Sequence, residues 1–241
     1  MARPVPSDSF ATGALEIGNP CDFRESQAQG RPIVAFDFDG TLTVRDSFTA
    51  LLQWKVGSAR YVAGVATLAP ALIGYLMSHD RGALKAAAAK RFFGPARKSE
   101  IEMTARRFAE AHARDLFRPD SIRVWKRWRD RGAVLVIVTA SPEETVAPFA
   151  RGLGADLLIG TRLSYDPQGR FTGKLDGINC RGDEKVRRLR EILGPDLRLA
   201  AAYGDTDGDH AMLAIADEAG FKVFNGVPQA APHEARRRRR P

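Results

Sequence analysis

Short apolar runs alternate with amphipathic segments along this chain. Short apolar runs occupy 33–38 and 133–138, and 197–205 and 220–224 are two further strand candidates. The first two runs are typical of strands buried on both faces of a parallel sheet. Residues 121–131 and 184–193 each place apolar side chains on one helical face just before a strand. This alternation predicts an α/β fold in which helices cover both faces of a parallel sheet.

The long stretch between the first two strands predicts an inserted helical unit. It spans about ninety residues, far more than a simple crossover needs, and carries almost no strand pattern. Residues 82–93 and 97–116 have the composition and apolar periodicity of helices. We therefore predict a domain organisation with five segments: a mobile N-terminal leader (1–30), a core in two parts (31–47 and 119–228), a helical cap (48–118) and a basic C-terminal tail (229–241).

The least polar part of the predicted cap is residues 61–79, where His79 is the only ionisable side chain apart from two tyrosines. Its length approaches that of a membrane span, but Pro70 and several small residues dilute its apolar character. The composition favours an apolar cap helix or helix pair that is buried against its neighbours. A helix lying in a membrane surface and a membrane span remain alternatives, because basic residues flank the segment on both sides: Lys55, Arg60, Arg81 and Lys85.

Charge and cysteine content limit the kinds of partner and the cellular compartment that we expect. The net charge is +8, and Arg236–Arg240 supply five positive charges in one run. Binding of polyanions or nucleic acid through this run is an alternative function, but no aromatic residues interleave the arginines, so no specific nucleic acid is expected. Cys21 and Cys180 form no disulfide or metal-binding pattern. A cytoplasmic protein is expected, with association at the inner face of an anionic membrane as an open alternative.

Acidic residues collect where the predicted strands end. Asp37 and Asp39 close the first strand, and Asp205 and Asp209 follow the third. Ligands of open α/β sheets bind outside the carboxyl ends of the strands, so we expect these side chains to meet. Carboxylates held this close repel one another unless a cation lies among them, and oxygen ligands favour Mg²⁺.

A magnesium site of this kind points to a phosphate-bearing substrate. Mg²⁺ usually keeps water or phosphate oxygens in the positions that protein groups leave open. Hydroxyl and ammonium groups would supply hydrogen bonds and positive charge to the phosphate, and three candidates lie near the strand ends or shortly before the third strand: Thr41, Thr139 and Lys185.

Four segments resemble the sequence motifs of the haloacid dehalogenase-like (HAD) hydrolase superfamily, in the family's order. They are FDFDGTLT (36–43), VIVTAS (136–141), GDEKVRRL (182–189) and YGDTDGDHAML (203–213). The resemblance implies a Rossmann-like core, an inserted C1-type cap and a subfamily IB phosphatase. Within that subfamily the chain most resembles phosphatidylglycerophosphatase C and, more distantly, phosphoserine phosphatase.

The resemblance also implies residue roles. Asp37 would be the nucleophile that forms an aspartyl-phosphate, and Asp39 the general acid and base. The carboxylates of Asp37 and Asp205 and the backbone carbonyl of Asp39 would hold Mg²⁺. Thr41, Thr139 and Lys185 would bind the phosphate, Asp209 would support the metal or Lys185, and Asp207 is expected only to cap a helix over 208–216.

Two substrate classes remain open. Phosphoserine phosphatases carry a glutamate nine residues after the nucleophile, where this chain has Asp46. An apolar cap with basic residues between Lys55 and Lys98 suits a lipid phosphate. Phosphatidylglycerophosphate or a related lipid phosphate is therefore the expected substrate, and a phosphoserine-like or other small soluble phosphomonoester is the alternative. Nothing in the sequence predicts the oligomeric state, and His112 is expected to be structural.

Overall fold

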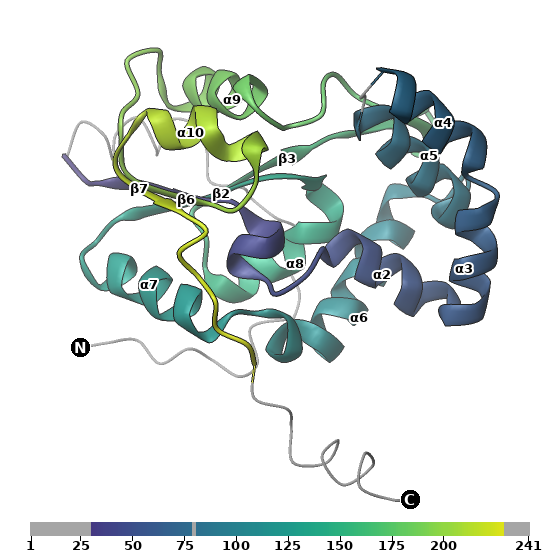
Figure 1. Cartoon of the computed structure of the whole chain (residues 1–241), viewed down its shortest axis with the longest axis horizontal. Helices are drawn as coiled ribbons and strands as arrows, with labels where there is room; N and C mark the ends of the chain where they lie inside the picture. The colour runs from purple at the N-terminus through teal and green to yellow at the C-terminus, as the bar shows by residue number, and fades with distance from the viewer. Residues whose placement is uncertain (1–29, 79–80, 229–241) are drawn as a thin grey trace, which may run out of the picture.

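The computed structural model describes residues 30–78 and 81–228. A five-stranded sheet forms the centre of the molecule, in the order β3-β2-β1-β6-β7, with every neighbouring pair parallel (Figure 1). Its strands are β1 (Ile33–Phe36), β2 (Val134–Pro142), β3 (Leu157–Thr161), β6 (Leu199–Gly204) and β7 (Ala216–Phe221). The predicted α/β fold is confirmed.

Side-chain alternation along the strands builds one core on each face of the sheet. Ile33 and Ala35 pack with α9 (Asp183–Leu193) and α10 (His210–Ala214). Val34 and Phe36 pack on the other face, with α7 (Pro119–Asp130) and α8 (Glu143–Leu153). Both faces are buried, which explains why the central strands are apolar throughout rather than alternately polar.

Helices inserted after β1 form a cap beside the sheet (Figure 1). The chain leaves the tight turn η1 (Phe38–Leu42) and continues through α2 (Ser47–Val56), α3 (Ser58–Ala66), α4 (Ala69–Ser78), α5 (Arg81–Phe93) and α6 (Lys98–Leu116). His112 lies against the rings of Phe108 and Trp54, with centroid distances of 5.1 and 6.1 Å, so it packs as expected of a structural residue.

The apolar segment 61–79 is a helix pair, α3 and α4, that bends by 55° at the break between them. The expectation that this pair is buried is wrong for its large apolar side chains, because most of them face solvent. The pair forms the outer layer of the cap and packs on α2 and α5 from one side only. Among the described helices none is by itself long and apolar enough to span a membrane; only α3 and α4 together reach that length and composition.

Two further differences concern strands. The strand expected at 220–224 lies earlier, at β7, whose exposed Glu218 pairs in register with Ala201 of β6. As the last strand of the sheet, β7 needs few apolar residues. A prediction based on apolar runs therefore placed the strand too late in the chain. The sequence analysis also missed β3 and the antiparallel hairpin of β4 (Leu163–Tyr165) and β5 (Phe171–Leu175), which lies against α5 of the cap.

Several expectations lie outside the described residues. These are the N-terminal leader, the arginine-rich tail and His79. Binding of polyanions through the tail therefore stays a prediction, as do the proposed domain boundaries.

Candidate active site

Asp37 lies directly after β1, at the carboxyl edge of the sheet. Its backbone N–H donates to the carbonyl of Tyr203 on β6 at 2.8 Å, which continues the strand pairing by one residue. Its side chain is buried, and Oδ1 accepts a hydrogen bond from Lys185 Nζ at 2.6 Å. Burial raises the pKa of Asp37 to about 7, against the lowering effect of Lys185. The hydrogen bond from Lys185 engages Oδ1 and leaves Oδ2, the other carboxylate oxygen, available to a ligand.

Lys185 enters the site from the first turn of α9 and joins three segments of the core. Its ammonium group donates to Asp37 Oδ1 at 2.6 Å, to Asp209 Oδ1 at 2.6 Å and to the carbonyl of Val138 at 2.7 Å. Burial by itself would lower the pKa of Lys185, but the two carboxylates outweigh it and raise the pKa. Lys185 therefore stays protonated and holds the Asp37 carboxylate in place.

Asp39 is held by two hydrogen bonds on the cap side of the site. Its Oδ1 accepts from the backbone N–H of Ser47 and its Oδ2 from the hydroxyl of Ser141, both at 2.6 Å. Burial raises the pKa of Asp39, and the nearby Asp46 carboxylate adds to that rise. A carboxyl group that keeps its proton to higher pH is suited to general acid catalysis.

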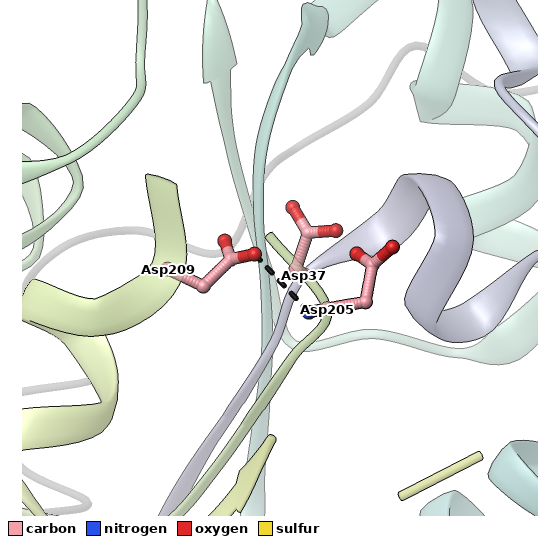
Figure 2. A group of neighbouring side chains, drawn as sticks. All are labelled: Asp37, Asp205 and Asp209. Carbon is pink, nitrogen blue, oxygen red and sulfur yellow. Dashed lines mark hydrogen bonds between the residues drawn. The ribbon is translucent and has the colours of Figure 1, made fainter. Parts of the chain in front are cut away.

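Three carboxylates lie close enough to share one cation. Asp37, Asp205 and Asp209 each offer an oxygen, and these atoms lie within 4.8 Å of one another (Figure 2). Asp209 is already engaged, because Oδ1 binds Lys185 and Oδ2 accepts from the backbone N–H and hydroxyl of Thr206, both at 2.9 Å. This all-oxygen donor set fits Mg²⁺. The separate roles of Asp37 and Asp205 as ligands and of Asp209 as their support stay predictions. Ligation through the carbonyl of Asp39 stays a prediction.

Gly40 makes room for Asp205. A Cβ atom at residue 40 would lie 2.1 Å from Asp205 Oδ2, and the backbone there has φ +86°, a conformation that favours glycine. Asp205 Oδ1 accepts from the hydroxyl of Thr41 at 3.1 Å. Thr41 was expected to bind phosphate. Its hydroxyl is engaged with Asp205, and its role in phosphate binding stays a prediction.

Thr139 lies near the end of β2, is buried, and lines the cavity as expected. Its Oγ1 accepts from the backbone N–H of Ser141 at 3.0 Å, which leaves the hydroxyl proton for a phosphate oxygen. The expectation that Asp207 caps a helix over 208–216 is wrong. The helix α10 begins at His210, and Thr206 and Asp209 make the hydrogen bonds at its approach.

The cavity above these residues has a volume of about 380 Å³ and is lined by both the core and the cap. The sequence analysis assigned no site role to five polar residues that line it: Arg81, Lys85, Asn179, Arg181 and Thr206. Lys85 lies one helical turn after Arg81 on α5, and its ammonium group donates to the carbonyl of Ala140. Burial lowers the pKa of Lys85, while Asp39 and Asp46 oppose that shift. The two acidic residues thus face a cation supplied by the cap.

Known proteins resemble this chain in sequence. The family described as haloacid dehalogenase-like hydrolase matches residues 34–214. Protein CicA of Caulobacter vibrioides is 61% identical over 196 residues, which cover 81% of this chain and 88% of CicA. Phosphoserine phosphatase SerB1 of Mycobacterium tuberculosis is 34% identical over 89 residues, only 36% of this chain and 29% of that protein.

Solved structures share the fold. A protein of unknown function from Bordetella pertussis Tohama I superposes with a TM-score of 0.66 at 21% identity, covering 87% of this chain and 96% of the other. A phosphoserine phosphatase solved as a phospho-aspartyl intermediate analogue gives a TM-score of 0.52 at 18% identity, over 78% and 85% of the two chains. The extent of the family match and the carboxylates at the strand ends agree: this chain belongs to the haloacid dehalogenase-like hydrolase family.

Proposed function

We propose that the protein is a Mg²⁺-dependent phosphomonoester hydrolase that works through an aspartyl-phosphate. The observation that carries the proposal is the arrangement of two carboxyl groups with different partners in one cavity, one buried (Asp37) and one half-buried (Asp39). Lys185 holds Asp37 as a nucleophile, while Asp39 accepts hydrogen bonds from Ser47 and Ser141 and, within the described part of the chain, from no cation. Environments that separate two carboxyl groups in this way assign one to attack and the other to proton transfer.

In the first half of the reaction, Asp37 Oδ2 attacks phosphorus and the bond between phosphorus and the ester oxygen breaks. Asp39 donates its proton to the departing oxygen, so an alcohol leaves and an aspartyl-phosphate remains. In the second half, Asp39 takes a proton from water as the water oxygen attacks phosphorus. Phosphate leaves and both carboxyl groups return to their starting states.

The remaining residues bind the phosphoryl group. Thr139 would donate its hydroxyl proton to one phosphate oxygen, and Arg81, Lys85 and Arg181 provide positive charge around the cavity. Mg²⁺, held by Asp37 and Asp205 and by the carbonyl of Asp39, would offset the charge that builds up on the phosphoryl oxygens.

The comparisons support a small soluble ester of the phosphoserine type, because a phosphoserine phosphatase is among the similar sequences and the similar folds. A specific observation favours lipid phosphates, phosphatidylglycerophosphate included, as a second candidate. An apolar groove of about 630 Å³ in the cap shares Asp46, Arg81 and Lys85 with the catalytic cavity. A substrate with a long apolar leaving group could occupy both.

Phosphate release in the presence of Mg²⁺ tests the proposal. The substrates are p-nitrophenyl phosphate, phosphoserine and phosphatidylglycerophosphate in mixed micelles. We expect wild type to hydrolyse at least one of them and Asp37→Asn to lose about 10³-fold or more in turnover, since it removes the nucleophile. Asp207→Asn is the matched control, because Asp207 is an exposed aspartate of the same loop as Asp205. Failure of wild type on every ester, or an active Asp37→Asn variant, would refute the proposal.

Trapping the covalent intermediate gives a second, independent readout. Acid quenching during turnover of a ³²P-labelled ester should leave label on wild type and on Asp207→Asn, but none on Asp37→Asn. Label that stays on the Asp37→Asn protein would place the nucleophile elsewhere.

A further inference from the structure

The outer layer of the cap exposes a cluster of large apolar side chains. We call α3 and α4, residues 58–78, the cap elbow. Half of the large apolar side chains that are exposed in the described part of the chain lie on it: Val62, Val65, Leu72, Ile73, Leu76 and Met77. Val62 is 67% exposed and Met77 82% exposed. Clustered exposure of this kind indicates a surface that is covered by a partner.

The charge around the cap elbow selects the partner. From Ser47 to Ser99 the sequence contains eight basic residues and a single acidic one, Asp80. Arg91 lies beside the bend, where its Nε donates to Thr67 Oγ1 at 2.9 Å. A surface of exposed aliphatic side chains with an excess of positive charge complements an anionic phospholipid bilayer, which offers both acyl chains and negative headgroups.

The inner side of the same helices opens toward the catalytic cavity. Tyr61, Leu68 and Tyr75 of the cap elbow line the apolar groove, together with residues of α2 and α5. Asp46 and Lys85 lie at its other end, where they also line the catalytic cavity. An occupant of this groove would thus be apolar at the end near the cap elbow and phosphorylated at the end near Asp37. A soluble protein partner could cover the exposed residues but would leave the groove without an occupant.

We propose that the cap elbow inserts into an anionic phospholipid surface and that the apolar groove receives the acyl part of a lipid phosphate. The second half of this inference rests on the proposed hydrolase activity. The cytoplasmic location and the association with the inner face of a membrane belong to this proposal, because that face carries the anionic lipids.

Vesicle sedimentation tests the docking surface. Three proteins are mixed with vesicles: wild type, the double variant Ile73→Asp with Leu76→Asp, and the control variant Met103→Asp. The vesicles consist of phosphatidylcholine alone or of phosphatidylcholine together with phosphatidylglycerol. Ile73 and Leu76 do not line the groove, and Met103 is an exposed apolar residue on α6. We expect wild type and Met103→Asp to bind the anionic vesicles and the double variant to bind about 100-fold more weakly, since it replaces two apolar contacts with charges.

The same experiment can overturn the docking proposal in two ways. Equal binding by wild type and the double variant would assign vesicle binding to another part of the chain. Loss of self-association in the double variant, with no vesicle binding by wild type, would make the cap elbow a subunit interface. Unchanged melting temperatures of the variants serve as the folding control, because the substituted side chains are exposed.

Hydrolysis assays separate this inference from the proposed function. The double variant should hydrolyse p-nitrophenyl phosphate like wild type but lose about 10-fold or more on a lipid phosphate in anionic vesicles. Ala88→Trp, which places a large side chain in the groove, should keep vesicle binding and the soluble substrate but lose the lipid substrate. Wild type that hydrolyses soluble esters only would overturn the lipid inference and leave the hydrolase. Wild type that binds vesicles but hydrolyses nothing would overturn the hydrolase and keep the docking surface.

Discussion

Substituting Lys185 by methionine keeps most of the side-chain volume but removes a buried cation that two carboxylates share. Asp37 and Asp209 each lie 2.6 Å from the ammonium nitrogen, and the Lys185 side chain is only 2% exposed. In the variant both carboxylates stay buried at the same edge of the sheet without this partner. Stability at neutral pH should therefore fall sharply.

The size of the loss follows from the contacts. The ammonium group makes three hydrogen bonds of 2.6 to 2.7 Å. Hydrogen bonds to charged groups contribute about 1.5–3 kcal/mol each, and breaking a buried ion pair by removing one partner costs about 3–5 kcal/mol in total. We expect the free energy of unfolding to fall by about 3–5 kcal/mol at pH 7.5. Adding Asp209→Asn should restore about 1–3 kcal/mol, because it removes one of the two unpaired charges.

The pKa values of the two carboxyl groups determine how the loss of stability changes with pH. Without Lys185, the pKa of Asp37 in the folded state should rise further above its unfolded value of about 3.9. The pKa of Asp209, which Lys185 lowers in the wild type, should rise above that value as well. A group with a raised folded pKa contributes stability below its unfolded pKa and loses it as the pH rises through the folded value. The difference between wild type and Lys185→Met should therefore be smallest near pH 4 and grow toward pH 8.

Urea unfolding without divalent cations, followed by circular dichroism, measures these differences. Lys174→Met is the matched control, because Lys174 is exposed, and should change stability by about 0.5 kcal/mol or less. A loss below about 1 kcal/mol in Lys185→Met that is also independent of pH would show that the buried carboxylates do not depend on this cation.

Three further substitutions probe other parts of the molecule. Asp39→Asn should lower turnover by about 10²–10⁴-fold in steady-state assays, and a drop below tenfold would exclude Asp39 as the general acid. The free energy of unfolding should not fall, since burial disfavours the charged form of Asp39. Gly40→Ala should weaken Mg²⁺ binding about tenfold or more in calorimetry, because the added Cβ would meet Asp205 Oδ2 at 2.1 Å, and an unchanged Kd would contradict this. Glu184, whose pKa is lowered to about 2 by Arg187 and Arg188, contributes stability above pH 4.5 that is lost as the pH falls toward 2. Unfolding curves should accordingly show less acid sensitivity in Glu184→Gln, and identical curves would refute that role.

Local sequence predicted where the acidic residues of the core meet. Asp37 and Asp205 follow strands, and chain order alone places the ends of parallel strands at one edge of the sheet. The prediction that Lys185 belongs to the site depended on the resemblance to a family, because nothing in the local sequence distinguishes this lysine from the other basic residues of its helix. Its three contacts reach β1, β2 and the loop after β6, which no local pattern encodes.

Local sequence did not predict which residues of the cap reach the cavity. Lys85 and Arg81 lie more than forty residues from Asp37 in the chain, and only the packing of α5 beside the sheet brings them to the cavity. Local sequence likewise does not show that the hydroxyl of Thr41 donates to Asp205, because the two residues lie far apart in the chain.

By itself, the sequence determined the alternation of strands and helices, the edge of the sheet that carries the carboxylates and the helical nature of the insertion. These properties depend on residue spacing, and spacing is local. Only the tertiary structure decided which side of α3 and α4 is covered, because burial depends on the neighbours that a helix meets. The apolar composition of 61–79 is the same for a buried pair and for an exposed one. Because the cap elbow packs on other helices from one side only, its outer side chains are exposed and its inner side chains line the apolar groove.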